Sequence, residues 1–313
     1  MDKKYVVGVD LGGTKICTAL SDLEGNIIAK EVVATNAQEG EAAVLGRICD
    51  TIEKVIIDGK LKNDDIKSIG VGSPGPLDAK NGIILTTPNL PFKEFRIVEN
   101  VKGRFNIPTH LENDANAAAI GEYLFGAGKG TQNMVYITVS TGIGGGAVIN
   151  GKLYRGSTGN ALEVGHMTIQ PDGPRCNCGN YGCAEALSSG TAIARQANDA
   201  VSRGLKTSLS SYDKVTSYEV FKEAEKGDKV ASFILNKSLN YLGICVANVA
   251  CAFDPDVIVI GGGVAQGGEI VFETVREVVK NRAIAPMNEC KVVPAGLGTD
   301  AGVMGAIAVA ISE

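Results

Sequence analysis

The sequence predicts an α/β protein built from two similar domains with a cleft between them. The order strand, glycine turn, strand, hairpin, strand occurs near the N-terminus and again from residue 134. A length of 313 residues allows two domains with separate cores. The chain is 44% hydrophobic and 21% charged, which is typical of a globular protein.

The first half opens with strands at residues 5–9 and 16–21 on either side of a glycine turn at 10–15. A hairpin signal at 24–26 leads to a third strand at 27–33. Apolar residues at helical spacing predict a helix over 39–58. A buried strand at 66–72 then ends in Ser-Pro-Gly-Pro.

The second half repeats the pattern with a strand at 134–140, a glycine turn at 141–146 and a strand at 147–149. Asn150-Gly151 is a strong hairpin turn, and a strand at 152–154 follows it. A helical stretch at 216–252 and a strand at 257–260 belong to this half. A helix at 300–311, rich in small residues, is expected to pack on the first domain. The predicted domains are 1–113 plus 301–313, and 114–300.

Composition narrows the functional classes. The sequence has no run of 18 apolar residues, so no transmembrane helix is expected. The N-terminus lacks the apolar core of a signal peptide. The net charge of −5 without a basic cluster argues against nucleic acid as a partner. Five cysteines scattered in apolar contexts are typical of buried free thiols in a reducing cytoplasm. A cytoplasmic protein that binds neither nucleic acid nor membrane is therefore expected.

Three thiols and one imidazole, His166, Cys176, Cys178 and Cys183, form the ligand set of a closed structural zinc site. Core thiols or a redox pair are the alternatives. The segment is too rich in glycine and proline for a core, and C-x-C is not the usual redox spacing. Two carboxylates flank the cluster, Glu163 and Glu185, and a zinc ion would hold them in a fixed geometry.

Glycine turns let backbone N–H groups approach phosphate oxygens closely. Asp10, before the first turn, could anchor Mg²⁺ through water, and Thr14 and Lys15 add a hydroxyl and a cation. Residues 142–147 fit a dinucleotide pattern, but a strand rather than a helix follows them. The strand at 257–260, the turn at 261–263 and the helical pattern after it are a plausible platform for a purine or ribose.

Asp114 stands where a short strand ends and an alanine-rich helix begins. It could be only the N-cap of that helix, because aspartate is a favoured cap. Alternatively it is a catalytic base that faces the cleft, kept ionised by the positive end of the helix dipole. The local sequence leaves both interpretations open.

The motifs at 10–15, 112–116, 141–146 and 261–263, together with the His/Cys cluster, resemble the repressor–ORF–kinase (ROK) family. The resemblance to its bacterial glucokinases runs from end to end and implies the duplicated actin/hexokinase (ribonuclease H-like) fold. It also implies ATP-dependent phosphorylation of the 6-hydroxyl of glucose. Asp114 would be the base, and His166 would serve both zinc and sugar. The sugar-binding residues would be Gly75, Asn89, Asn113, Asp114, Glu163, His166 and Glu185.

The nucleotide is expected to contact Asp10, Gly12, Gly13, Thr14, Lys15, Thr141, Gly142, Gly144, Gly262 and Gly263. ATP, Mg²⁺ and structural Zn²⁺ are the expected cofactors, and a homodimer or homotetramer is the expected assembly. The family usually carries Gly or Ala before the glutamate at 163, whereas this chain has Leu162. That departure makes the hexose less certain than the phosphoryl chemistry.

Three rival functions are compatible with parts of the sequence. The first is a kinase for another sugar, such as N-acetylmannosamine, N-acetylglucosamine, fructose or allose, because the hydroxyl-binding carboxylates are shared. The second is a sugar-responsive repressor, which would carry a DNA-binding domain before the kinase fold. The phosphate turn begins at Asp10 and the chain is acidic, so a repressor is not expected. The third is a zinc-stapled binding protein without catalysis.

Overall fold

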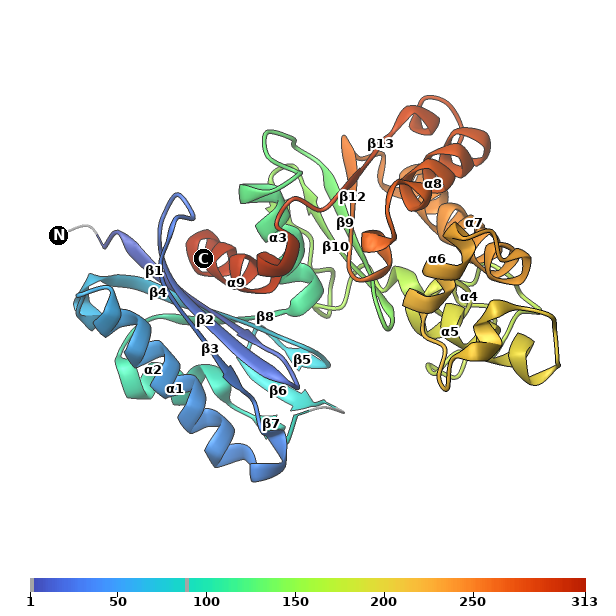
Figure 1. Cartoon of the computed structure of the whole chain (residues 1–313). Coiled ribbons are helices and arrows are strands. Elements are labelled where there is room, and N and C mark those ends of the chain that lie inside the picture. Colours follow the sequence, from blue (N-terminus) through green and yellow to red (C-terminus); the bar gives the residue numbers. More distant parts are fainter. Residues whose placement is uncertain (1–2, 88–89) are drawn as a thin grey trace.

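The structure is a computed structural model that describes residues 3–87 and 90–313. Each domain is built on a five-stranded sheet, and α3 (Asp114–Phe125) and α9 (Ala301–Ser312) lie between the sheets (Figure 1). The sheets run β3-β2-β1-β4-β8 and β11-β10-β9-β12-β13, so the strand order is the same in both. The fold is therefore the duplicated, two-domain actin/hexokinase-like fold that the sequence predicts.

In the first sheet the hairpin strands are antiparallel, and β1, β4 and β8 run parallel. Its strands are β1 (Tyr5–Leu11), β2 (Lys15–Asp22), β3 (Ile27–Ala34), β4 (Ile66–Ser73) and β8 (Thr109–Asn113). In the second sheet β9, β12 and β13 run parallel, and β10 and β11 are antiparallel. Its strands are β9 (Met134–Val139), β10 (Ile143–Ile149), β11 (Lys152–Leu153), β12 (Val257–Gly261) and β13 (Lys291–Pro294).

Helices cover these sheets. The longer ones are α1 (Glu41–Asp58), α2 (Ile97–Phe105), α3 (Asp114–Phe125), α5 (Gly190–Ser202), α6 (Ser217–Glu225), α7 (Lys229–Phe253), α8 (Glu269–Arg282) and α9 (Ala301–Ser312), and α4 (Ala184–Ser188) is a single turn. A small sheet that sequence reasoning missed consists of β5 (Leu77–Asp78), β6 (Ile83–Thr86) and β7 (Lys93–Phe95). Strands of two to four residues are too short to show an alternating pattern.

The predicted glycine turn at 141–146 is wrong in extent, because β10 already begins at Ile143. The glycines at 144–146 lie within the strand, where neighbouring backbone approaches it. A Cβ on Gly146 would lie 2.7 Å from the Cβ of Ala119 and 3.0 Å from the carbonyl of Ala115, both on α3. These glycines therefore permit a close helix–sheet contact rather than a turn.

The single helical stretch predicted at 216–252 is also wrong, because it is two helices, α6 and α7. Gly227 adopts a left-handed conformation with φ of 89° between them. Asp228 then caps α7 by accepting hydrogen bonds from the backbone N–H groups of Val230 and Ala231. Glycine ends one helix and the following aspartate caps the next, so this pair separates two helices even though the apolar residues keep a continuous helical spacing.

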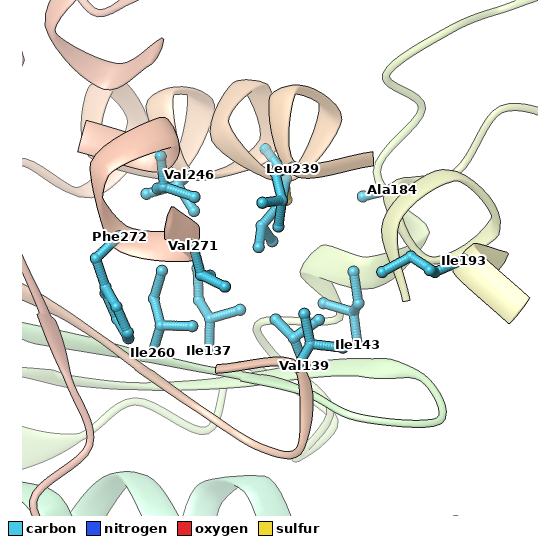
Figure 2. Packing of buried hydrophobic residues seen from close by; sticks show 14 of the residues in the cluster. Ile137, Val139, Ile143, Ala184, Ile193, Leu239, Val246, Ile260, Val271 and Phe272 are labelled. Carbon is cyan, nitrogen blue, oxygen red and sulfur yellow. The ribbon is translucent and has the colours of Figure 1, made fainter. Parts of the chain in front are cut away.

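Helix α7 is long and apolar enough to cross a membrane by length and composition, but 56% of its most apolar window is buried inside the protein. Its buried face packs against α8, α6 and α5. Figure 2 shows Leu239 and Val246 of α7 above Ile137 and Ile260 of the second sheet. We therefore describe α7 as the central core helix of the second domain.

Helix α9 packs on β1 and β4 of the first sheet, whereas α3 packs on β9 and β10 of the second. The two helices cross closely, since a Cβ on Gly305 would lie 2.5 Å from the carbonyl of Ala117. Because of these contacts we propose the division into residues 1–113 plus 301–313 and residues 114–300.

Cysteine burial differs from the prediction. Cys17 and Cys245 are buried, Cys49 and Cys290 are half-buried, and Cys251 is exposed on α7.

Candidate functional site

The first glycine turn joins β1 to β2 and is closed by a hydrogen bond from the Gly12 N–H to the Lys15 carbonyl (3.0 Å). The buried Thr35 hydroxyl donates to the Gly12 carbonyl at 2.6 Å. This bond and a backbone bond from the Thr35 N–H to the Thr14 carbonyl hold the turn against the residue that follows β3. Gly12, Gly13, Thr14 and Lys15 therefore lie together at one end of the first sheet.

Asp10 precedes this turn at the end of β1. Burial raises the pKa of its carboxyl above the usual value, and the charge of Lys15 partly offsets that effect. The start of α9 lies against the carboxylate, since a Cβ on Gly302 would lie 2.3 Å from Asp10 Oδ2. Glycine at 302 thus allows the backbone of α9 to come close to an acidic group.

The second glycine turn joins β9 to β10, and the Ser140 N–H donates to the Gly142 carbonyl at 2.8 Å. Glu185 lies against this turn: its Oε2 accepts a hydrogen bond from the Ile143 N–H at 3.0 Å. The same oxygen lies 2.4 Å from where a Cβ of Gly142 would stand. Glu185, Thr141 and Gly142 line a cavity of about 300 Å³ together with Arg175.

A cavity of about 420 Å³ lies between the N-termini of α3 and α9 and the turn after β12. Its lining includes Asp114, Tyr136, Thr138, Gly262 and Gly263. Gly262 has φ of 89°, and a Cβ there would lie 2.4 Å from the Val139 carbonyl, so only glycine fits without strain. Sequence reasoning missed Tyr136 and Thr138, because strand residues of these types give no functional signal in a single sequence.

A smaller cavity of about 140 Å³ lies on the other side of the start of α3. The predicted sugar residues that line it are Asn113, Asp114 and Glu163. Gly144, predicted for the nucleotide, also lines it, as does Asn160, which sequence reasoning missed. Asp114 lines both this cavity and the larger one, so a single carboxylate lies between the two.

Asp114 is the first residue of α3, and its N-cap is Asn113. The Asn113 side chain accepts from the N–H of Ala115 at 3.0 Å and of Asn116 at 3.5 Å. Asp114 Oδ1 accepts from the Ala115 N–H at 2.8 Å. The interpretation of Asp114 as the N-cap is therefore wrong, and its other oxygen is not needed by the helix.

The predicted effect of the helix on this carboxyl is also corrected. Burial raises the pKa of Asp114, the bond from Ala115 lowers it, and the charges of Asp10 and Glu163 raise it further. The net direction is upward, so desolvation outweighs the stabilising N–H group.

The ligand atoms of His166, Cys176, Cys178 and Cys183 all lie within 4.8 Å of one another. Cys176 Sγ is 3.7 Å from His166 Nδ1, and the Sγ atoms of Cys178 and Cys183 are 3.7 Å apart. Four ligands about 2.3 Å from a tetrahedral ion would be roughly 3.8 Å apart. The residues therefore fit Zn²⁺.

The loop that carries the thiols folds tightly on itself. The Cys176 N–H donates to the Asn180 carbonyl at 2.7 Å, and the Gly179 N–H donates to the Cys176 carbonyl at 3.0 Å. Gly182 has φ of 66°, and a Cβ there would overlap the Gln170 carbonyl.

His166 links this cluster to the small cavity. Its Nδ1 faces Cys176, while its Nε2 lies 3.9 Å from Glu163 Oε2. One ring nitrogen is thus on the thiol side and the other on the carboxylate side, the arrangement needed for the predicted double role.

The remaining three predicted sugar residues differ in where they lie relative to the small cavity. A Cβ on Gly75 would lie 3.4 Å from Asn113 Nδ2, so this loop lies beside Asn113, a residue that lines the small cavity. Glu185 is not brought to that cavity, because its carboxylate is turned to the Ile143 N–H. Asn89 lies outside the described residues.

Leu162, the departure noted in the sequence, adopts a left-handed backbone with φ of 67° and a buried side chain. Such a conformation is strained for a bulky residue and easy for glycine. The backbone geometry therefore gives a physical reason for a small residue at this position.

Residues 6–313 match the ROK family. The chain belongs to this family. It is 37% identical to a glucokinase of Halalkalibacterium halodurans over 313 residues, which cover 97% of this chain and 94% of the relative. It is 33% identical to a xylose repressor of Caldicellulosiruptor bescii over 100% of this chain, which is 79% of that protein.

Solved structures resemble the whole chain. A ROK hexokinase from Thermus thermophilus has a TM-score of 0.86 at 37% identity, covering 98% of this chain and 97% of its own. A ROK family glucokinase from Streptomyces griseus, in complex with glucose and AMPPNP, has a TM-score of 0.79 at 34% identity. The coverage is 99% of this chain and 100% of that one.

Proposed function

We propose that this ROK family member is a sugar kinase that transfers the γ-phosphoryl group of MgATP to the 6-hydroxyl of glucose. The observation that supports it most is the place of Asp114, between a nucleotide-sized cavity and a small polar one. The similar glucokinase of Streptomyces griseus in complex with glucose and an ATP analogue supports both ligands.

In this proposal the sugar lies in the small cavity against Asn113, Glu163 and the free face of His166, with the loop of Gly75 beside Asn113. Asn89 is a further expected sugar contact. Asp114 takes the proton of the 6-hydroxyl as that oxygen attacks the γ-phosphorus. The bond from the γ-phosphorus to the bridging oxygen breaks, and ADP leaves. General-base assistance of this kind typically contributes about a hundred- to ten-thousand-fold.

The nucleotide lies in the larger cavity, with Gly262 and Gly263 beside the base or ribose. Its phosphates reach the glycine turn at residues 12–15, Thr141 and Gly142 in the turn before β10, and Gly144 in β10. Asp10 would anchor Mg²⁺ through water, and the ion would neutralise phosphate charge. Zn²⁺ would be held by His166 and the three thiols as a structural crosslink. A homodimer or homotetramer in the cytoplasm is the expected form.

Phosphoryl transfer is tested by ADP release with MgATP across hexoses and N-acetylhexosamines. We expect glucose to give the highest kcat/KM. 6-Deoxyglucose should bind as an inhibitor without turnover, because it lacks the accepting hydroxyl. Analogues that lack another contacted hydroxyl should react more slowly, since they leave buried polar groups unpaired.

The outcomes separate the alternatives. A clearly higher kcat/KM for N-acetylmannosamine or another sugar would replace glucose and keep the kinase. Sugar binding without turnover of any sugar would favour a sugar-responsive regulator, a possibility that the similarity to xylose repressors raises.

A further inference from the structure

Glu112, at the end of β8, is a buried carboxylate one residue before the Asn113–Asp114 pair and only 1% exposed. Its Oε1 accepts hydrogen bonds from the Asn113 N–H and from Asn116 Nδ2, each at 3.0 Å. Its Oε2 accepts from Arg155 Nε at 2.6 Å. Two of these three donors, on Asn113 and Asn116, flank Asp114 in the chain, so Glu112 fixes the segment that carries the proposed base.

Arg155 comes from the second domain, two residues after β11, and joins Glu112 of the first sheet. Its carbonyl accepts from the Ala161 N–H at 3.2 Å, which closes the loop 155–161. This loop carries Asn160 and Ala161 in the lining of the small cavity and leads directly to Glu163. Arg155 thus begins the loop that forms one side of the small cavity, and its guanidinium binds Glu112, which precedes the Asn113–Asp114 segment on the other side.

The guanidinium also contacts Glu313, after α9, where Nη2 lies 2.5 Å from Oε1. The side chains of this second pair are 39% and 36% exposed, whereas Glu112 is almost fully buried. Exposed pairs contribute little, and a buried charge without a partner is costly. Loss of the pair with Glu112 should therefore have a larger effect than loss of the pair with Glu313, so Glu313 serves as the control.

We propose that Arg155 and Glu112 are positioning residues, which hold loop 155–163 and the Asn113–Asp114 segment at the spacing that sugar phosphorylation needs. This inference rests on the proposed sugar-kinase function and extends it to residues that touch neither sugar nor nucleotide. A small displacement of a reacting group costs about a hundredfold in rate. None of the residues at 155–163 lines the larger cavity, so nucleotide binding should be insensitive to the pair.

The test compares Arg155→Gln, Arg155→Lys, Glu112→Gln and the double variant Glu112→Gln/Arg155→Gln with the wild type. For Arg155→Gln we expect kcat/KM for the sugar to fall at least about tenfold, with KM for ATP within roughly twofold. Arg155→Lys should recover part of the lost kcat/KM. An ammonium restores the positive charge but lacks the planar set of N–H donors that lets a guanidinium contact two carboxylates. Glu313→Gln should leave the sugar parameters within about twofold, because it removes only the exposed partner.

Arg155→Gln can unfold, because it leaves the Glu112 charge unpaired. The double variant removes both charges and should recover stability, so its sugar kinetics isolate the positioning role. We expect the double variant to melt at the wild-type temperature. Its kcat/KM for the sugar should nevertheless stay at least about tenfold below the wild-type value. Wild-type sugar kinetics in the double variant would overturn the inference and leave the pair a stabilising contact.

A readout independent of turnover separates this inference from the proposed function. Hydrogen exchange of the amides at residues 113–116 should be faster in the double variant than in the wild type and unchanged in Glu313→Gln. If the wild type phosphorylates no sugar, the function fails while the exchange data still decide whether the pair orders the Asn113–Asp114 segment. Unchanged exchange at these amides would contradict the inference.

Discussion

At the scale of single residues, Asp114 is a carboxylate in a place that disfavours its charge. Burial and the neighbouring charges of Asp10 and Glu163 raise its pKa, and the backbone N–H groups of Ala115 and Asp114 oppose them. Asn113 supplies the helix cap, so the carboxylate is free to act. A strained or desolvated charge that the fold does not need is typical of a functional group.

Asp114→Asn should lower kcat by at least roughly a hundredfold while glucose binding and the fold remain. Asn is nearly isosteric and keeps the bond to Ala115, but it cannot take a proton. The measurement is kcat, glucose affinity and melting temperature on this variant. Near-wild-type turnover would remove Asp114 from the mechanism.

The raised pKa of Asp114 predicts two pH effects with definite signs. The base must be ionised, so kcat/KM should fall as pH drops through a value above the usual 3.8. A carboxyl with a raised pKa costs stability when ionised: the cost is absent below 3.8, grows up to the raised pKa and is constant above it. Asp114→Asn should thus be as stable as the wild type, or more so, at pH 7.

Urea unfolding at pH 7 and at lower pH checks this stability effect. The advantage of Asp114→Asn should shrink as pH falls toward 3.8. An advantage that grows toward acid pH would contradict the assignment.

At the scale of elements, glycines decide where helices and strands can approach. Gly146 in β10 faces α3, where an added Cβ would lie 2.7 Å from the Cβ of Ala119. In α2, by contrast, a Cβ on Gly103 meets nothing within 4 Å. The same substitution therefore has opposite consequences in two regular elements.

Gly146→Ala should lower the free energy of unfolding by about 1–3 kcal/mol, because overpacking shifts α3 from the sheet. Gly103→Ala is the matched control and should raise it by roughly 0.5–1 kcal/mol, since alanine restricts the unfolded chain in a helix position. Urea denaturation measures both. Equal stabilities of the two variants would mean that α3 does not press on β10 as described.

The loop that carries the proposed zinc ligands is the second element with a clear test. Protein purified without chelator should contain one zinc per chain. Cys178→Ser should lose zinc and melt at a lower temperature, because a structural metal contributes folding free energy. Cys251→Ser, which removes an exposed thiol on α7, should keep the zinc and the wild-type melting temperature. A fully active, zinc-free preparation would rule out the site.

At the scale of the whole molecule, the two domains are joined where α3 crosses α9. Glu122 of α3 is fully buried and accepts hydrogen bonds from the N–H groups of Ala127, Gly296 and Leu297 at 2.8–2.9 Å. Residues 296–297 lead from β13 of the second sheet to α9 on the first. One carboxylate thus secures the point where the chain passes between domains.

Glu122→Gln should lower the free energy of unfolding by roughly 1.5–3 kcal/mol, the typical value of one hydrogen bond to a charged group. Glutamine keeps one acceptor oxygen and turns an amide toward backbone donors. Glu99→Gln, whose side chain is 74% exposed, is the control and should change little. Denaturation followed by two probes checks the shift, and an unchanged midpoint for Glu122→Gln would contradict it.

The sequence by itself determined the duplicated fold, because hydrophobic period and turn residues are local signals. It also singled out the four His and Cys residues that the structure brings together, since their types and spacing lie within 18 residues, His166–Cys183. Continuous helical spacing masked the break between α6 and α7 at Gly227 and Asp228, and strands β5–β7 are too short to show an alternating pattern.

Only the tertiary structure decided which groups meet across the chain. Asp114 lies between two cavities, His166 shows different nitrogens to Cys176 and Glu163, and Glu185 turns to Ile143 rather than to the small cavity. The pair of Arg155 with Glu112 joins residues 43 positions apart. Such contacts depend on how helices and sheets pack, and desolvation then sets the charge of each group, so no local pattern in the sequence records them.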